Sequence, residues 1–338
     1  MANSYSDAVR NGTLGATRVQ KRLSIKDEIN IHGGQVDVFD AFHKIGLELL
    51  FRPLDGLLGA YLTDPVPGVL ITTQREMSIQ RFTAAHELGH FSMDHKPSLD
   101  DENLLRRATV PEKKPGMPLY EEIEADAFAA EFLMPRWLML WHIKRQNWTG
   151  KSLSNPTNIY QLSLRVGASF EATCRTLFRQ KLLDRPSVER LLGTRPKEMK
   201  ADLLREYKPS SYRGNVWLLT ENDADTRIDG SRHDYFVLRL NEHSGSGYLW
   251  NFEQLKSSGF CIVHDEQETI DSEAIGGATC RCITASLDEA YKGKLSVNET
   301  RPWDPKQSLS DFTIDVDMTG PEEKGLSRAS KRRLLEAA

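Results

Sequence analysis

The spacing of apolar positions changes along the chain and divides it into parts. Residues 18–43 carry apolar side chains on one side of a helical pattern, and residues 78–93 form a second helix-forming run. Between them, residues 46–51 and 68–72 are short apolar runs separated by turns rich in Pro and Gly. This order predicts a small β-sheet beside the helix at 78–93.

The next part alternates between a polar stretch and further helices. Residues 96–118 are charged and rich in Pro, which predicts a long exposed loop, and its position between two helices makes it a candidate lid. A helix is predicted at residues 120–133. Residues 162–178 then give a helix, a turn that contains Gly167 and a second helix, which resembles a helix-turn-helix.

Beyond residue 207 the apolar period shifts toward two, with candidate strands at 216–219, 235–240, 259–263 and 279–284. Such a series of short strands predicts a separate β-sandwich. The sequence therefore predicts an α+β protein with domains at residues 18–150, 151–206 and 207–312 and a tail at 313–338. Basic residues at 331–333 indicate that the tail is a short helix or a disordered end.

Charge and composition narrow the classes of partner. The 338 residues carry a formal net charge of −4, which gives no reason at the level of the whole protein to expect binding to nucleic acid or membrane. Residues 151–205 alone hold eleven Lys and Arg against five Asp and Glu, which allows contacts with phosphates. The same helix pair recurs as a purely structural module, so we expect no DNA binding.

The chain also gives an expectation about its location. No apolar run approaches the ~20 residues that span a bilayer, and residues 1–17 lack the apolar core of a signal peptide. The four cysteines are scattered without the spacing of a zinc finger, so reduced thiols are expected. We therefore expect a cytoplasmic protein.

Residues 86–90 form the motif His-Glu-x-x-His inside the helical run at 78–93. At about 3.6 residues per turn, His86 and His90 lie one above the other on one helix face, close enough to share a metal ion at roughly 2.0–2.1 Å. Glu87 lies about 100° around the helix, where its carboxylate reaches a water on the open side of the metal without being a ligand. The motif predicts a metal site, with Zn²⁺ as the expected ion and Glu87 as general base.

A third ligand is expected from the helix at 120–133. Helical spacing places Glu124 and Glu131 on a polar, solvent-facing side, whereas Glu122 and Asp126 fall on the side that should be buried. A buried carboxylate pair is costly unless it meets a metal or hydrogen-bond donors. Glu122 is therefore the predicted third ligand, and Asp126 the predicted acceptor that orients a ligand histidine. Glu121 and Glu124 remain alternatives for the ligand.

Further polar residues near these helices are candidates for the lining of the site. These candidates are His95 and His142. A donor to the oxyanion of the transition state is expected as well. The candidates for this donor are Tyr120, His95, His142 and a tyrosine from elsewhere in the chain.

Two segments together resemble a known family. Residues 80–90 (Gln-Arg-Phe-Thr-Ala-Ala-His-Glu-Leu-Gly-His) and 122–135 (Glu-Ile-Glu-Ala-Asp-Ala-Phe-Ala-Ala-Glu-Phe-Leu-Met-Pro) resemble the ImmA/IrrE family of zincin-like metallo-endopeptidases. The resemblance spans residues 20–145 and agrees in both segments and in their order. It implies that His86, His90 and Glu122 bind zinc and that Glu87 is the catalytic base. The family often has Asn where this chain has Asp126.

The family supplies a substrate class that the residues alone do not. Its members are typically intracellular proteases that cut a helix-turn-helix repressor, often in mobile elements or stress responses. The resemblance therefore implies a zinc-dependent endopeptidase that cleaves a regulatory protein site-specifically, in a stress or phage-defence response. The alternative is a regulatory binding protein that keeps the zincin scaffold and acts through its helical segment or its sandwich without proteolysis.

The C-terminal strands carry a second resemblance. Turn sequences at residues 245–250, 275–277 and 301–303 resemble, in type and order, the chagasin-like inhibitors of cysteine proteases, an immunoglobulin-like fold whose three loops form one binding edge. The resemblance spans residues 210–310. It implies a recognition edge made of Tyr248, Trp250, Gly276, Gly277, Arg301 and Trp303. The alternative is that the aromatic residues among them pack the sandwich.

Overall fold

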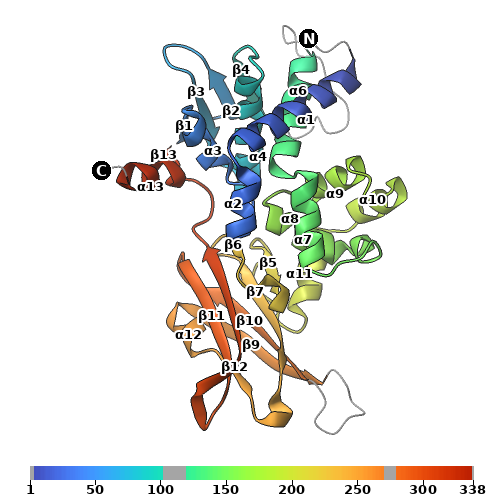
Figure 1. The fold of residues 1–338 in the computed structure, drawn as a ribbon, viewed down its shortest axis with the longest axis vertical. Helices are drawn as coiled ribbons and strands as arrows, with labels where there is room; N and C mark the ends of the chain where they lie inside the picture. Colours follow the sequence, from blue (N-terminus) through green and yellow to red (C-terminus); the bar gives the residue numbers. More distant parts are fainter. Residues whose placement is uncertain (1–3, 102–118, 270–278, 337–338) are drawn as a thin grey trace.

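The computed structural model describes residues 4–101, 119–269 and 279–336. It has a helix-rich part that contains a five-stranded sheet and, below it in Figure 1, a part made of two four-stranded sheets. Within the described ranges, no helix combines the length and the apolar character that crossing a membrane requires.

The five-stranded sheet has the strand order β13-β1-β3-β2-β4. β1 and β3 are parallel, and the other neighbours are antiparallel. The strands are β1 (Glu48–Arg52), β2 (Leu57–Leu62), β3 (Gly68–Thr72), β4 (Ser98–Asp101) and β13 (Gly325–Leu326). β1 and β3 confirm two predicted strands, whereas β4 lies in the stretch predicted to be an exposed loop. The rest of that stretch, residues 102–118, lies outside the described residues.

Helices of the N-terminal half pack around this sheet. They are α1 (Tyr5–Arg22), α2 (Ile25–His32), α3 (Val38–Ile45), α4 (Met77–Ser92) and α6 (Leu119–Leu133). α1 begins before the predicted domain boundary at residue 18. It packs closely on α6: a Cβ at Gly12 would lie only 2.1 Å from the main-chain oxygen of Glu124, so a glycine is needed there. α6 also packs on α4, where a Cβ at Gly89 would lie 3.1 Å from Phe128. Small residues thus let the two helices that carry the motif and the predicted third ligand approach each other.

The helices that follow extend the same core. They are α7 (Arg136–Arg145), α8 (Pro156–Val166), α9 (Phe170–Arg179), α10 (Arg185–Leu192) and α11 (Pro196–Leu204). Leu162 of α8 and Leu177 of α9 belong to the buried cluster that includes Phe51 and Leu88 of the sheet part. The turn between α8 and α9 has φ of +65° at Gly167, in the region that favours glycine. The predicted order of helix, glycine turn and helix is confirmed, but the core of this segment is continuous with the preceding part.

The C-terminal part consists of two four-stranded sheets, ordered β5-β7-β10-β9 and β6-β12-β11-β8. Their strands are β5 (Val216–Leu219), β6 (Arg227–Asp229), β7 (Tyr235–Glu242), β8 (Leu249–Asn251), β9 (Phe260–Thr269), β10 (Thr279–Leu287), β11 (Lys292–Arg301) and β12 (Asp304–Asp317), with the short helix α12 (Glu253–Ser257). Trp217 and Phe236 of the first sheet and Phe312 of the second belong to one buried cluster. The strands predicted beyond residue 207 are therefore present, and β12 continues past the predicted boundary at 312.

Buried polar contacts hold the C-terminal sheets against the helices. Arg165 of α8 and Asp223, exposed by only 5% and 2%, approach to 2.8 Å between Nη2 and Oδ1. Gln161, one turn earlier on α8, donates from Nε2 to the main-chain oxygen of Val216 at 2.7 Å. Because removal of one partner of a buried ion pair leaves an unpaired charge away from water, this contact strongly favours one placement of the two parts.

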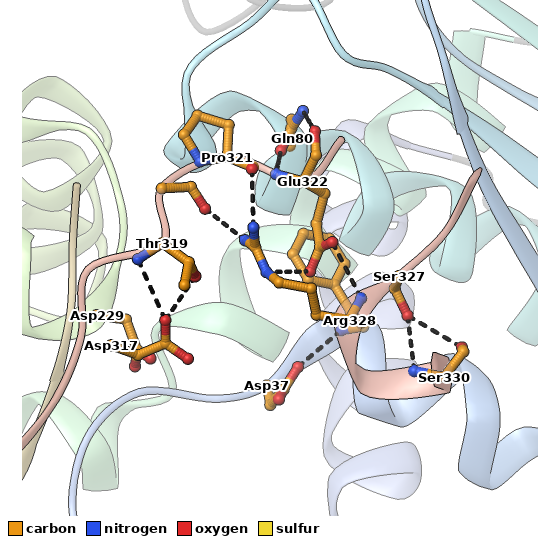
Figure 2. A network of polar contacts seen from close by, with 12 residues as sticks. Asp37, Gln80, Asp229, Asp317, Thr319, Pro321, Glu322, Ser327, Arg328 and Ser330 are labelled. Atoms are coloured by element: carbon orange, nitrogen blue, oxygen red, sulfur yellow. Dashed lines mark hydrogen bonds and ion pairs between the residues drawn. The ribbon is translucent and has the colours of Figure 1, made fainter. Parts of the chain in front are cut away.

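The C-terminal segment returns to the helix-rich part (Figure 1). β13 pairs with β1, and the basic helix α13 (Arg328–Glu336) packs on α3. Figure 2 shows Gln80 of α4 beside Glu322, whose main-chain N–H donates to Gln80 Oε1 at 2.8 Å. Gln80 Nε2 in turn donates to the main-chain oxygen of Glu322 at 3.1 Å. A short helix was one of the two predicted states of the chain end, the other being a disordered end, and its attachment to the sheet and to α4 was not predicted.

Candidate metal centre

Helix α4 brings the three functional residues of the motif to the interior. It lies between the sheet and α6, and the exposed fractions of His86, Glu87 and His90 are 0%, 0% and 1%. The two histidine Nε2 atoms lie 3.0 Å apart. Ligand atoms at roughly 2.0–2.1 Å from one zinc ion stand roughly 3.3 Å apart in a tetrahedron, so the two imidazoles fit a shared ion.

Helix α6 brings Glu122 to the same point. Its Oε2 lies 3.8 Å from His86 Nε2, and its Oε1 lies 3.9 Å from His90 Nε2. Glu122 is 7% exposed, as helical spacing predicted for this face. Two imidazole nitrogens and a carboxylate are a donor set that zinc takes in hydrolytic sites. The residues present therefore fit a zinc ion.

Both histidines are held through their second ring nitrogen. His86 Nδ1 lies 2.9 Å from Oδ1 of Asp126, the predicted orienting residue. His90 Nδ1 lies 3.0 Å from His95 Nδ1, and His95 Nε2 lies 2.9 Å from Glu124 Oε2. When His90 Nε2 faces a metal, its Nδ1–H donates to His95, and His95 Nε2–H donates to the carboxylate of Glu124. One tautomer of each ring satisfies the whole chain of contacts.

The prediction that Glu124 faces solvent is wrong. Glu124 is 7% exposed, because α1 covers this side of α6 and Asn11 Nδ2 donates to Glu124 Oε1 at 2.8 Å. His95 contacts the other carboxylate oxygen. Glu131, also predicted to face solvent, is half-buried, and burial raises its pKa to about 7 against the opposing effect of Arg179. Contacts from elements distant in the sequence therefore decide the environment of both carboxylates.

A further acidic residue, Asp100 of β4, lies at the histidine pair. Its Oδ2 is 3.2 Å from His86 Nε2, and His86, His90 and Asp100 together form a group with the spacing of metal ligands. Ser98, two residues earlier on β4, donates from Oγ to Glu87 Oε2 at 2.8 Å. Sequence reasoning missed both, because a four-residue strand in a polar stretch carries too short a pattern to recognise. The only signal was the pair of polar residues, two apart, shortly after the motif.

The carboxylates around α4 change the proton affinities of the site. Burial alone would lower the pKa of His86, but the Asp100, Asp126 and Glu87 carboxylates outweigh it and raise this pKa to about 9. Burial raises the pKa of Glu87 well above its usual value, and the neighbouring Asp100 raises it further. A carboxylate with a raised pKa is suited to accept a proton near neutral pH.

Other candidates from the sequence differ in their surroundings. His142 of α7 is buried, and its Nε2 donates to the main-chain oxygen of Gly34 at 3.0 Å, so its prediction as a site-lining residue is wrong. Tyr120 is exposed at the start of α6, and Glu121 is half-buried beside it.

The predicted recognition residues of the C-terminal part differ in their surroundings. Trp250 is 7% exposed, belongs to the buried cluster and donates from Nε1 to the main chain of β7 at 2.8 Å, so its assignment to a recognition edge is wrong. Trp303 is 73% exposed. Arg301 lies over the ring of Tyr248, with 4.4 Å between its Cζ and the ring centre. Two predicted residues lie outside the described ranges, Gly276 and Gly277.

Comparisons with solved structures find two cysteine protease inhibitors among the similar chains. EhICP2 from Entamoeba histolytica is 22% identical, with a TM-score of 0.29, and the match covers 32% of this chain and 99% of that one. PbICP-C, solved in complex with falcipain-2, is 14% identical, with a TM-score of 0.21, over 33% of this chain and 95% of that one. A comparison with curated proteins found no match.

The comparison with family models concerns the part that contains the candidate metal centre. The model described as the IrrE N-terminal-like domain matches residues 44–178, from the end of α3 to α9. This range includes the motif on α4 and Glu122 on α6. The resemblance that these two helices carry in the sequence is thereby confirmed. Residues 44–178 of this chain are therefore similar to the IrrE N-terminal-like domain of the Peptidase_M78 family.

Proposed function

We propose that the protein is a zinc-dependent endopeptidase. The observation that carries the proposal is the donor set: His86 and His90 Nε2 atoms 3.0 Å apart, with Glu122 facing both. Glu87 lies beside them, fully buried, where a general base is needed. The match of residues 44–178 to a metallopeptidase family supports the same function.

In this proposal, His86, His90 and Glu122 hold the zinc. When bound, zinc polarises the scissile carbonyl and lowers the pKa of water. Glu87, whose pKa burial raises, takes a proton from the attacking water and passes it to the leaving amine. This transfer avoids expulsion of an unprotonated amine, which is a poor leaving group.

The surrounding residues keep the ligands in position. Asp126, 2.9 Å from His86 Nδ1, fixes the tautomer in which His86 Nε2 has its lone pair toward the metal. His95 does the same for His90, and Glu124 for His95. Such outer contacts make a ligand both more basic and less mobile.

We propose a regulatory protein as the substrate, for example a helix-turn-helix repressor that is cut at one site. The support is the substrate class of the ImmA/IrrE family, which the two motif segments resemble. With such a substrate we also propose that the protein acts in the cytoplasm, in a stress response or in phage defence. We assign no DNA binding to residues 151–206, since α8 and α9 bury their apolar faces in the common core and α8 also contacts the C-terminal sheets.

We assign recognition of a protein to the C-terminal part, as an immunoglobulin-like sandwich. Its support is the exposed Trp303 together with Arg301 stacked on Tyr248, because Trp, Tyr and Arg supply much of the energy at protein interfaces. Trp303 also lies over Gly247, where a Cβ would be 2.5 Å from its ring. Changing Trp303 to Ala is expected to weaken substrate binding without unfolding the sandwich.

The test of the function uses the wild type and Glu87→Gln, incubated with candidate regulators from neighbouring genes. The wild type should give a cut band, and Glu87→Gln should cut at least about 10²-fold more slowly, the low end for general acid–base catalysis. Zinc content and thermal stability should be equal in the two proteins. Equal cutting by Glu87→Gln would contradict the proposed base, and failure of the wild type to cut any candidate would favour the regulatory binding protein.

A further inference from the structure

Strand β4 occupies the sheet edge that lies beside the metal centre. Many proteins bind an extended peptide by pairing it with an exposed sheet edge. In this chain the outer edge of β2 is already paired with β4, antiparallel, with Gly59 opposite Asp100 and Tyr61 opposite Ser98. A peptide that pairs with β2 at this edge would have to replace β4.

The register brings side chains of β4 to the reacting groups. A Cβ at Gly59 would lie 2.9 Å from Glu87 Oε1, so β2 at this residue touches the general base. Its partner Asp100 has Oδ2 at 3.2 Å from His86 Nε2. β4 is therefore an extended chain whose side chains contact both the base, through Ser98, and the histidine pair, through Asp100. The scissile segment of a substrate has to reach the same two groups.

The side-chain pattern of β4 suits a polar site and not a hydrophobic core. Ser98 and Asp100 are exposed by 2% and 0%, whereas Leu99 between them is 56% exposed. A strand that covers a hydrophobic core shows the opposite alternation. Ser98 donates to Glu87 at 2.8 Å, and Glu87 and His90 are exposed by at most 1%. β4 thus contributes to shielding the base and the histidines from solvent.

We propose that β4 is an autoinhibitory strand. It takes the substrate's place along β2, and the Asp100 carboxylate binds the zinc at the position that a water or a substrate carbonyl needs. The enzyme becomes active when β4 leaves this edge, and the change exchanges one ligand for another without making or breaking a covalent bond. The inference rests on the proposed function, because it requires that His86, His90 and Glu122 bind the metal.

The test uses the full-length protein loaded with Co²⁺, whose visible absorption reports its ligands, and acetohydroxamate as a small probe that binds an accessible metal. Asp100→Asn should change the cobalt spectrum and bind the probe at least about tenfold more tightly than the wild type. In the wild type, β4 should cover the metal in most molecules, and the apparent affinity for the probe is then reduced to the fraction of molecules in which β4 has left. Asp94→Asn, an exposed acid just before β4, should match the wild type. Asp100→Asn should also cut casein, an unfolded substrate, faster than the wild type.

A second variant covers the case in which Asp100→Asn unfolds. Ser98→Ala removes one hydrogen bond to Glu87 and no charge, and it should also tighten binding of the probe. Equal probe affinity in the wild type and in a folded variant would overturn the autoinhibitory role even if the wild type cuts casein. Loss of stoichiometric cobalt in folded Asp100→Asn would overturn it too, because Asp100 would then be a permanent ligand.

The remaining outcomes separate this inference from the proposed function. Tighter binding of the probe without any cleavage of casein or of a candidate regulator would support the strand's role and count against the peptidase. Failure of the wild type to bind cobalt would overturn both. Cleavage that depends on Glu87, with identical cobalt spectra in the wild type and Asp100→Asn, would support the peptidase alone.

Discussion

At the scale of single residues, the carboxylate of Glu124 is linked to the proposed metal ligand His90 through His95. It accepts His95 Nε2–H at 2.9 Å and so fixes the tautomer in which His95 Nδ1 accepts from His90. We expect Glu124→Gln to weaken zinc binding by about 10-fold to 100-fold, the usual cost of losing an outer partner of a metal ligand. Competition with a chromogenic chelator measures this. Glu131→Gln on the same helix is the control, and equal affinities of the two variants would contradict the contact's role.

A second residue, His142, should make stability depend on pH. Its pKa is lowered to about 3, because burial disfavours the imidazolium and Arg165 and Arg145 repel it. The folded protein therefore binds no proton at this ring at pH values where the unfolded chain, with the ordinary pKa of 6.5, already does. The contribution of His142 to the free energy of unfolding is therefore expected to be constant above pH 6.5 and to decrease as the pH falls from 6.5 toward 3.

Urea unfolding at about pH 7 and about pH 5 measures this dependence. In His142→Gln the titrating group is gone, so the difference in the free energy of unfolding between the two pH values should shrink. A difference as large in His142→Gln as in the wild type would show that other groups cause it.

At the scale of elements, the fit of β2 against α4 depends on Gly59. A Cβ there would lie 2.5 Å from Thr83 Cγ2 and 2.9 Å from Glu87 Oε1. We expect Gly59→Ala to lower the free energy of unfolding by about 1–3 kcal/mol, the usual cost of overpacking. Gly68→Ala on the neighbouring strand β3 is the control, because its Cβ would meet atoms only at 3.5 Å or more. Urea unfolding compares the two, and equal stabilities would refute the tight approach.

The elements also show what the sequence can predict. β1, β3 and α4 were predictable because their apolar runs and helical motif are local patterns. β4 and β13 were not, because each is short and is defined by pairing with a distant strand, β4 with β2 and β13 with β1. The same limit explains the site: Glu122 follows from helical spacing, whereas Asp100 depends on the register of β4.

At the scale of the whole molecule, the C-terminal segment is part of the fold that carries the metal centre. Gln80 of α4 is fully buried, donates to the main-chain oxygens of Thr72 and Glu322 at 3.1 Å each, and accepts from the Glu322 N–H at 2.8 Å. Gln80→Ala leaves these groups unpaired, at about 1–3 kcal/mol for a buried group. We expect its unfolding midpoint in urea to fall well below that of Gln74→Ala, an exposed control. Equal midpoints would mean that the segment is only loosely attached.

The central claim is that the protein binds zinc through residues of α4 and α6. The zinc content of the purified protein tests this claim most directly. His86, His90 and Glu122 should bind one zinc per chain, and Glu87 should not be a ligand. We therefore expect elemental analysis of the purified proteins to find one zinc per chain in the wild type and in Glu87→Gln, and far less in Glu122→Ala. Equal zinc content in Glu122→Ala and the wild type would contradict the account.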